Sequence, residues 1–322
     1  MASFSRILCV IDPTSKTQPA LERAAWIAKK SGASLDLLIC YYNEYLTSGP
    51  FFEPAKFAKY REHALGRQKE SLELMAAPLR SEGLNVETTA VWDKPLHEGV
   101  IRQANELKAD VVFKDTHHHS GLNRSIFSNT DWNLIRACQI PLWLVKPGDA
   151  AADPKIIAAI DPFNEHDKPA SLDHQMLQLG KSIAEDVDGD LHAFHSFDAT
   201  AVIAATAGAG TAFGPTFVAV PGIEDQISES HQEKLEEISE QFGISRSHAH
   251  LASGLIQNEL PALANEIGAS VVIMGAISRN RLRRLYVGAS AERTLEHLEC
   301  DLLVVKPEWF QSPVEMEVSD AD

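Results

Sequence analysis

The chain has 322 residues, of which 44% are hydrophobic and 23% charged, and its formal net charge is −16. This length allows about two domains, each large enough to bury its own core. The acidic balance argues against proteins that bind nucleic acid or anionic lipid through general positive charge. Neither a secretory leader nor a continuous apolar stretch of about 18 residues is recognisable, so we expect a cytoplasmic protein without a membrane span.

The first half alternates apolar runs with segments of helical spacing. Runs rich in Val, Ile and Leu predict buried parallel strands at residues 4–11, 35–41, 86–92, 111–113 and 142–145. Apolar residues at helical spacing predict a helix with Pro19 in its first turn and Gly32 at its end, and others at 58–82, 96–107 and 131–138. Such alternation predicts a parallel sheet with right-handed crossovers and helices on both faces.

The second half repeats the first. The segment RILCVIDP at 6–13 is matched 149 residues later by KIIAAIDP, and IPLWLVKP at 140–147 is matched 160 residues later by CDLLVVKP. The corresponding strands are predicted at 156–160, 191–195, 249–252, 271–274 and 302–305. We therefore predict an α/β protein of two tandem, doubly wound, Rossmann-like domains, each with a five-stranded, mainly parallel sheet. Their predicted bounds are 1–148 and 154–310, followed by an acidic, disordered tail at 311–322.

The two offsets differ because the second half carries an insertion. Residues 199–223 are small and apolar with interspersed Gly and Pro. They fit either a surface loop on their own domain or an apolar wall over a ligand cleft, where an apolar ligand or a partner would bind. The duplication also predicts pseudo-twofold packing of the halves through their fifth strands, as an intramolecular pseudo-dimer. Whether two chains form a homodimer stays open.

A ligand site is predicted in the second half. Open parallel sheets bind ligands beyond the C-terminal ends of their strands, where the strand order reverses. Asp161 and Pro162 follow the first strand there, and a loop beginning at Gly275 follows the fourth. The glycine Gly288 would begin a helix whose free N–H groups can hold phosphate. Arg279 is the nearest candidate for a phosphate contact, although the loop arginines also fit a solvated face.

These residues resemble a known family. The aspartate after strand one, a loop similar to G-x2-G-x9-G-S/T after strand four, and the tandem layout resemble the universal stress protein family, over roughly 4–147 and 155–307. In ATP-binding members, the aspartate contacts the nucleoside and the loop holds the ribose and phosphates. The resemblance places these roles on Asp161, Gly275, Ser278, Gly288 and Ala289, with Ser290 as a substitute hydroxyl. Two positions depart from the pattern: Ser278 replaces the middle glycine and Ala289 replaces the hydroxyl residue.

The first half lacks this loop pattern. At an offset of 160, Asp115, His118 and Ser128 stand at the positions of Gly275, Ser278 and Gly288. A carboxylate at 115 would lie where phosphates should bind, so we predict no family-type ATP site in this half. On an extended backbone His117 and His119 would face the same way and could bind Zn²⁺, with Asp115 as third ligand. An exposed polar loop without metal is the alternative.

Three functions follow from these features. The first is a stress-response protein that binds ATP or a related nucleotide in its second half and acts through ligand-dependent regulation. The second is a slow ATPase in that half, using Mg²⁺ with the nucleotide, combined with a zinc site in the first half. The third is a binding module for a larger ligand with apolar and phosphate parts. No catalytic residue is indicated by the sequence.

Overall fold

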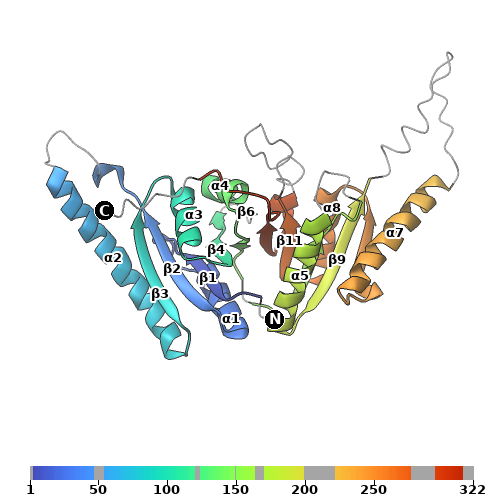
Figure 1. The fold of residues 1–322 in the computed structure, drawn as a ribbon, viewed down its shortest axis with the longest axis horizontal. Helices are drawn as coiled ribbons and strands as arrows, with labels where there is room; N and C mark the ends of the chain where they lie inside the picture. Colours follow the sequence, from blue (N-terminus) through green and yellow to red (C-terminus); the bar gives the residue numbers. More distant parts are fainter. Residues whose placement is uncertain are drawn as a thin grey trace, which may run out of the picture.

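The computed structural model describes residues 3–46, 54–119, 124–148, 150–163, 170–198, 222–276 and 294–314. Two halves lie side by side, with the long helices α2 and α7 at the two outer ends (Figure 1). Within the described ranges, no helix is long and apolar enough to cross a membrane.

The first half contains every strand predicted there. Its elements are β1 (Arg6–Val10), α1 (Pro19–Ser31), β2 (Ser34–Tyr41), η1 (Glu44–Leu46), α2 (Pro54–Ser81), β3 (Val86–Trp92), α3 (Leu96–Glu106), β4 (Val111–Asp115), β5 (His117–His119), β6 (Arg124–Ile126), α4 (Asn129–Ala137) and β7 (Leu142–Val145). The sequence patterns also predicted both ends of α1. Pro19 occupies its first turn, where no N–H partner is needed, and Gly32 adopts the left-handed conformation that ends it.

The second half follows the same order. Its elements are β8 (Lys155–Ala159), α5 (Ala170–Val187), β9 (Asp190–Phe197), α7 (Ile223–Gln241), η2 (Arg246–His248), β10 (Ala249–Ser253), α8 (Ile256–Ile267), β11 (Val271–Gly275) and β12 (Asp301–Val305). One local feature differs from expectation. The segment after β4, predicted as a loop, contains the short antiparallel pair β5–β6, which forms a sheet of its own.

The main sheet has ten strands in the order β10-β9-β8-β11-β12-β7-β4-β1-β2-β3. All neighbours are parallel except β12 and β7, which pair antiparallel. The halves therefore join through their fifth strands, as the duplication predicted, and their two five-stranded sheets become one. In each half the first strand lies between the second and the fourth, so the strand order reverses beside β1 and beside β8.

Helices cover both faces of this sheet. Strand side chains alternate between two apolar clusters: Ile7 and Cys9 belong to one, whereas Leu8 and Val10 belong to the other. The first cluster packs against α1, α2, α5 and α7, and the second against α3, α4 and α8. Each cluster includes residues of both halves, so the apolar core is continuous across the antiparallel junction.

Polar contacts reinforce that junction. The carboxylate of Asp301 is 2% exposed and accepts hydrogen bonds from Trp143 Nε1 at 2.9 Å and from the backbone N–H of Lys146 at 3.0 Å. Its Oδ2 lies 3.3 Å from a guanidinium nitrogen of Arg23, whose side chain is also buried. Lys146 Nζ in turn donates to the backbone carbonyl of Leu298. The contacts of Asp301 thus tie β12 of the second half to α1 and β7 of the first.

Candidate functional site

The second half brings three predicted site residues to one edge of the sheet. Asp161 and Pro162 directly follow Ile160 at the C-terminal end of β8, and Gly275 ends the neighbouring parallel strand β11. The backbone N–H of Asp161 donates to Asp173 Oδ2 on α5 at 3.1 Å. The edge where the strand order reverses therefore carries Asp161, as the strand pattern predicted.

The rest of the predicted site lies outside the described residues. This applies to Ser278, Arg279, Gly288, Ala289 and Ser290, and to nearly all of the apolar insertion at 199–223. Their roles stay predictions from the sequence.

A group of stacked rings beside Asp161 was not predicted as part of the site. The ring of Phe163 lies against that of His231 of α7 in a tilted arrangement, with 4.3 Å between centroids and 42° between ring planes. Phe197 of β9 stacks on the same imidazole at 4.5 Å. His195 Nε2 lies 2.8 Å from His231 Nδ1, and its Nδ1 lies 3.2 Å from the carbonyl oxygen of Ile160. The inner rings are buried, whereas Phe163 is 38% exposed. An aromatic residue two positions after the strand-one aspartate was the available sequence signal.

In the first half, the corresponding aspartate is engaged by its own loop. Thr14 donates to Asp12 Oδ1 from its backbone N–H at 2.8 Å and from its hydroxyl at 2.6 Å. Thr14 stands at the sequence position of Phe163, which has no side-chain donor. The side chain of Gln18 also accepts from the backbone N–H of Asp12 at 3.3 Å and donates to its carbonyl at 2.7 Å.

Asp115 at the end of β4 lies against the beginning of α1. Its Oδ1 accepts a hydrogen bond of 2.6 Å from the backbone N–H of Ala20, so a carboxylate occupies the end of this helix that attracts anions. Burial raises the pKa of Asp115 to about 6, although the hydrogen bond from Ala20 and the nearby charge of Lys114 act in the opposite direction. Gly275 of the second half presents no carboxylate at the matching position.

A second carboxylate occupies the start of α4. Ser128 and Asp131 form a reciprocal capping box, in which Ser128 Oγ accepts from the backbone N–H of Asp131 and Asp131 Oδ2 accepts from that of Ser128. Lys114 Nζ lies 2.7 Å from Asp131 Oδ1, and Asp131 is fully buried. The helix start that would hold a phosphate in this half is therefore filled by a side chain and its counter-charge.

The predicted zinc site has no support. The backbone of His117 and His119 is extended in β5, as the prediction required, but their side chains lie outside the description. Across the described ranges, no group of three His, Cys, Asp or Glu residues could hold a metal ion.

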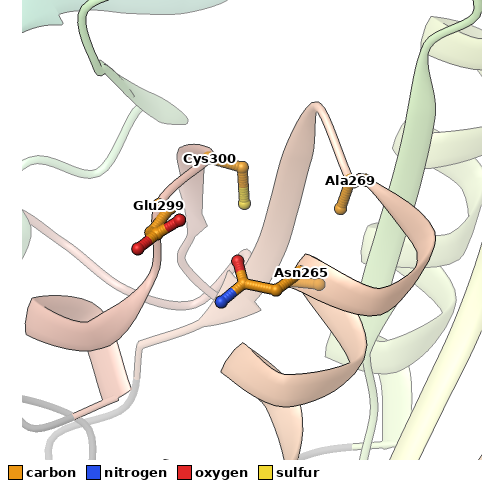
Figure 2. Close-up of a pocket in the computed structure, with 6 residues that line it drawn as sticks. Asn265, Ala269, Glu299 and Cys300 are labelled. Carbon is orange, nitrogen blue, oxygen red and sulfur yellow. The ribbon is translucent and has the colours of Figure 1, made fainter.

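A groove of about 400 Å³ lies at the opposite edge of the sheet (Figure 2). It is bounded by the end of α8, including Asn265 and Gly268, and by Glu299 and Cys300 just before β12. Cys300 and Asn265 point into it from the two sides (Figure 2). Burial raises the pKa of Cys300 to about 12, so its thiol is a weak nucleophile at neutral pH. This groove is separate from the edge that carries Asp161.

Comparisons with known proteins agree with the duplication. The model of the Universal stress protein family matches residues 3–146 and again residues 155–306. Universal stress protein E of Escherichia coli K12 is 27% identical over the whole length of both chains, and that of Photorhabdus laumondii is 25% identical over 98% of each.

Solved structures show the same fold. A functionally unknown protein from Pseudomonas aeruginosa PAO1 superposes with a TM-score of 0.71 at 24% identity, covering 94% of this chain and 93% of that one. A universal stress protein from Archaeoglobus fulgidus gives a TM-score of 0.60 at 15% identity, with coverage of 94% and 98%.

Proposed function

Because the chain belongs to the universal stress protein family, with one family domain in each half, we propose that its second half binds ATP or a related nucleotide. In this proposal the protein acts in the cytoplasm as a stress-response regulator, and the nucleotide changes the conformation or partner contacts of the second half. The two domains, at 1–148 and 154–310, then have different roles: the second holds the ligand and the first is a structural partner.

The observation that carries the proposal is the contrast between the two copies of the site edge. In the first half Asp12, Asp115 and Asp131 are each engaged by contacts within the protein. The second half has Asp161 at the position of Asp12, but replaces the other two carboxylates by Gly275 and Ala291. In the first half, acidic side chains thus occupy the positions where an anion could bind. In the second half, two of the three corresponding positions carry no acid.

Charge supports the same assignment. A triphosphate would be repelled in the first half by Asp115 and Asp131, because both carboxylates lie at the helix starts that would otherwise attract it. In the second half, Gly288 and the neighbouring arginines follow β11 in the sequence and would supply N–H groups and positive charge. We propose the nucleoside beside Asp161 and Pro162, and the phosphates along the loop containing Gly275, Ser278, Arg279, Gly288, Ala289 and Ser290.

Phe163 supports a ligand with a planar base. Its ring is partly exposed at the site edge and is held in place by the imidazole of His231, which is itself buried between rings. A fixed, partly exposed aromatic ring is a suitable surface for base stacking. No observation on the described residues favours hydrolysis or zinc binding, and neither belongs to the proposal. An apolar ligand part against residues 199–223 stays a prediction.

Isothermal titration calorimetry of the full chain tests the proposal with a matched pair of variants. We expect one ATP per chain, with binding lost or strongly weakened in Asp161→Asn and unchanged in Asp12→Asn. Gly288→Asp, which places a carboxylate at the predicted phosphate contact, should also abolish binding. Absence of ATP binding by the wild-type chain, or its loss in Asp12→Asn alone, would reject the assignment.

A further inference from the structure

Three imidazoles meet at the N-terminal end of the β9–β10 edge, away from the proposed nucleotide site. His192 on β9 is 5% exposed, and its Nδ1 lies 2.9 Å from Nε2 of His250 on β10. The ring of His248, the last residue of η2, lies tilted by 31° against that of His192, with 4.2 Å between centroids. In the contact between His192 and His250, one ring nitrogen must donate a proton and the other must accept it. This hydrogen bond therefore exists only while at least one of the two rings is neutral.

The surroundings do not offset a positive charge on these rings. Lys155 at the start of β8 lies close enough to disfavour protonation of His192, whereas Asp190 acts in the opposite direction. On the other side, Glu266 of α8 favours protonation of His250. Burial outweighs both carboxylates. It lowers the pKa of His192 to about 4, with a further contribution from the two neighbouring imidazoles, and also lowers that of His250.

In the first half, the position equivalent to His192 carries a charged residue in an ion pair. By the register of the parallel strands, Asp36 of β2 stands where His192 stands in β9. Asp36 forms a two-point ion pair with Arg6, with distances of 2.7 Å from Nε and 2.9 Å from Nη2, and Glu87 of β3 lies across from it. The edge of the first half is thus held by opposite charges.

Comparison of the two halves shows which residues at this place are kept and which are replaced. Lys155 keeps the positive charge found at Arg6. The carboxylate of Asp36 is replaced by an imidazole. The ring of His248, which directly precedes the paired residue Ala249, lies against His192, and Glu87 lies across from Asp36 in the first half. Two acids beside a base have become two histidines beside a base. Carboxylate–guanidinium pairs keep their charges through the pH range in which imidazoles titrate.

We propose that the histidines His192, His248 and His250 make the β9–β10 edge of the second half an acid-sensitive switch. In mild acid His192 and His250 gain protons, the hydrogen bond between them is lost, and like charges separate β10 from β9. The first half, held by Arg6 and Asp36, stays closed. Opening of the edge exposes backbone N–H and C=O groups of β9 and β10 that pair with each other in the closed state, so the pH sets how much of this edge is accessible.

Proton linkage gives the direction and the size of the pH effect on opening of the β9–β10 edge. The pKa of His192 is about 4 in the closed edge and 6.5 for an unperturbed histidine, so the open state binds more protons between these values. Stability of the edge is therefore complete above pH 6.5 and falls as the pH decreases towards 4. At pH 5 the opening equilibrium shifts by about 30-fold from this one residue, relative to pH 7.5.

Hydrogen exchange of the full chain at pH 7.5 and pH 5.0, corrected for intrinsic exchange rates, tests the switch. We expect protection to fall by roughly 30-fold in peptides covering β9 and β10, and to change little in those covering β2 and β3. His192→Asp places a carboxylate beside Lys155, as Asp36 lies beside Arg6 in the first half, and should abolish the loss of protection at pH 5.0. His97→Gln changes a histidine of α3 outside the cluster, and this variant should still lose protection in β9 and β10.

Three results would overturn the proposal. One is equal loss of protection in both halves, which indicates general acid unfolding. The second is unchanged protection at β9–β10, and the third is a loss that persists in His192→Asp. Should that variant fail to fold, an NMR titration of the wild-type imidazoles decides. A titration of His192 near pH 6.5 in the closed protein would remove the basis of the switch.

Discussion

Removal of the carboxylate at the junction of the halves should strongly destabilise the whole chain. In Asp301→Ala, the buried guanidinium of Arg23 loses its contact with this carboxylate, and Trp143 Nε1 and the backbone N–H of Lys146 lose their acceptor. Breaking a buried ion pair on one side costs about 3–5 kcal/mol, because the remaining charge stays away from water. Burial raises the pKa of Asp301, but Arg23, the two hydrogen bonds and Lys146 all favour its ionised form.

The assay is urea unfolding at pH 7.5, followed by circular dichroism and tryptophan fluorescence. We expect the unfolding free energy to fall by about 3–5 kcal/mol and the thermal midpoint by on the order of 10 °C. Asp301→Asn, which can still accept a hydrogen bond from Trp143, should lose less. The control is Glu82→Ala, which breaks the exposed pair with Lys29 and should cost under about 1 kcal/mol. If Asp301→Ala stays within 1 kcal/mol of the wild type, the junction does not depend on this carboxylate.

Three further outcomes are expected. Burial lowers the pKa of Lys306 from 10.5 to about 8, so the charged ammonium destabilises the folded state at neutral pH. Lys306→Met should therefore raise the unfolding free energy by about 3 kcal/mol at pH 7. The wild type gains stability as the pH rises from 8 to 10.5, so the unfolding free energies of the wild type and Lys306→Met should be almost equal at pH 10.5. The same difference between them at pH 7 and pH 10.5 would contradict the reasoning. Asp131→Ala leaves Lys114 without its carboxylate and opens the start of α4, so the chain should lose about 3 kcal/mol. Millimolar phosphate should raise the thermal midpoint of Asp131→Ala by more than it raises that of the wild type. An equal rise in both proteins would count against the view that Asp131 occupies an anion-binding position at the start of α4. Phe163→Thr should weaken ATP binding by about tenfold in calorimetry while tripolyphosphate binding stays unchanged, and equal ATP affinity would exclude stacking on this ring.

The sequence alone determined the class of fold and its duplication. Strand positions were readable because each buried strand is a short apolar run, and the order of elements repeats at nearly constant spacing. The ends of α1 were also readable, since Pro19 and Gly32 act through local backbone geometry. Asp161 could be placed beside the C-terminal end of β11 because parallel strands bring their C-terminal ends to one edge of the sheet.

Tertiary structure decided the contacts between residues distant in the chain. Asp301 meets Trp143 and Arg23 only because β12 pairs antiparallel with β7, which joins the two sheets. Neither the ring contact of Phe163 with His231 nor the pairing of His192 with His250 has a local sequence signal, since each joins distant segments of the chain. A strand pattern states which residues share a face, but strand register and helix packing select the partners that they meet there.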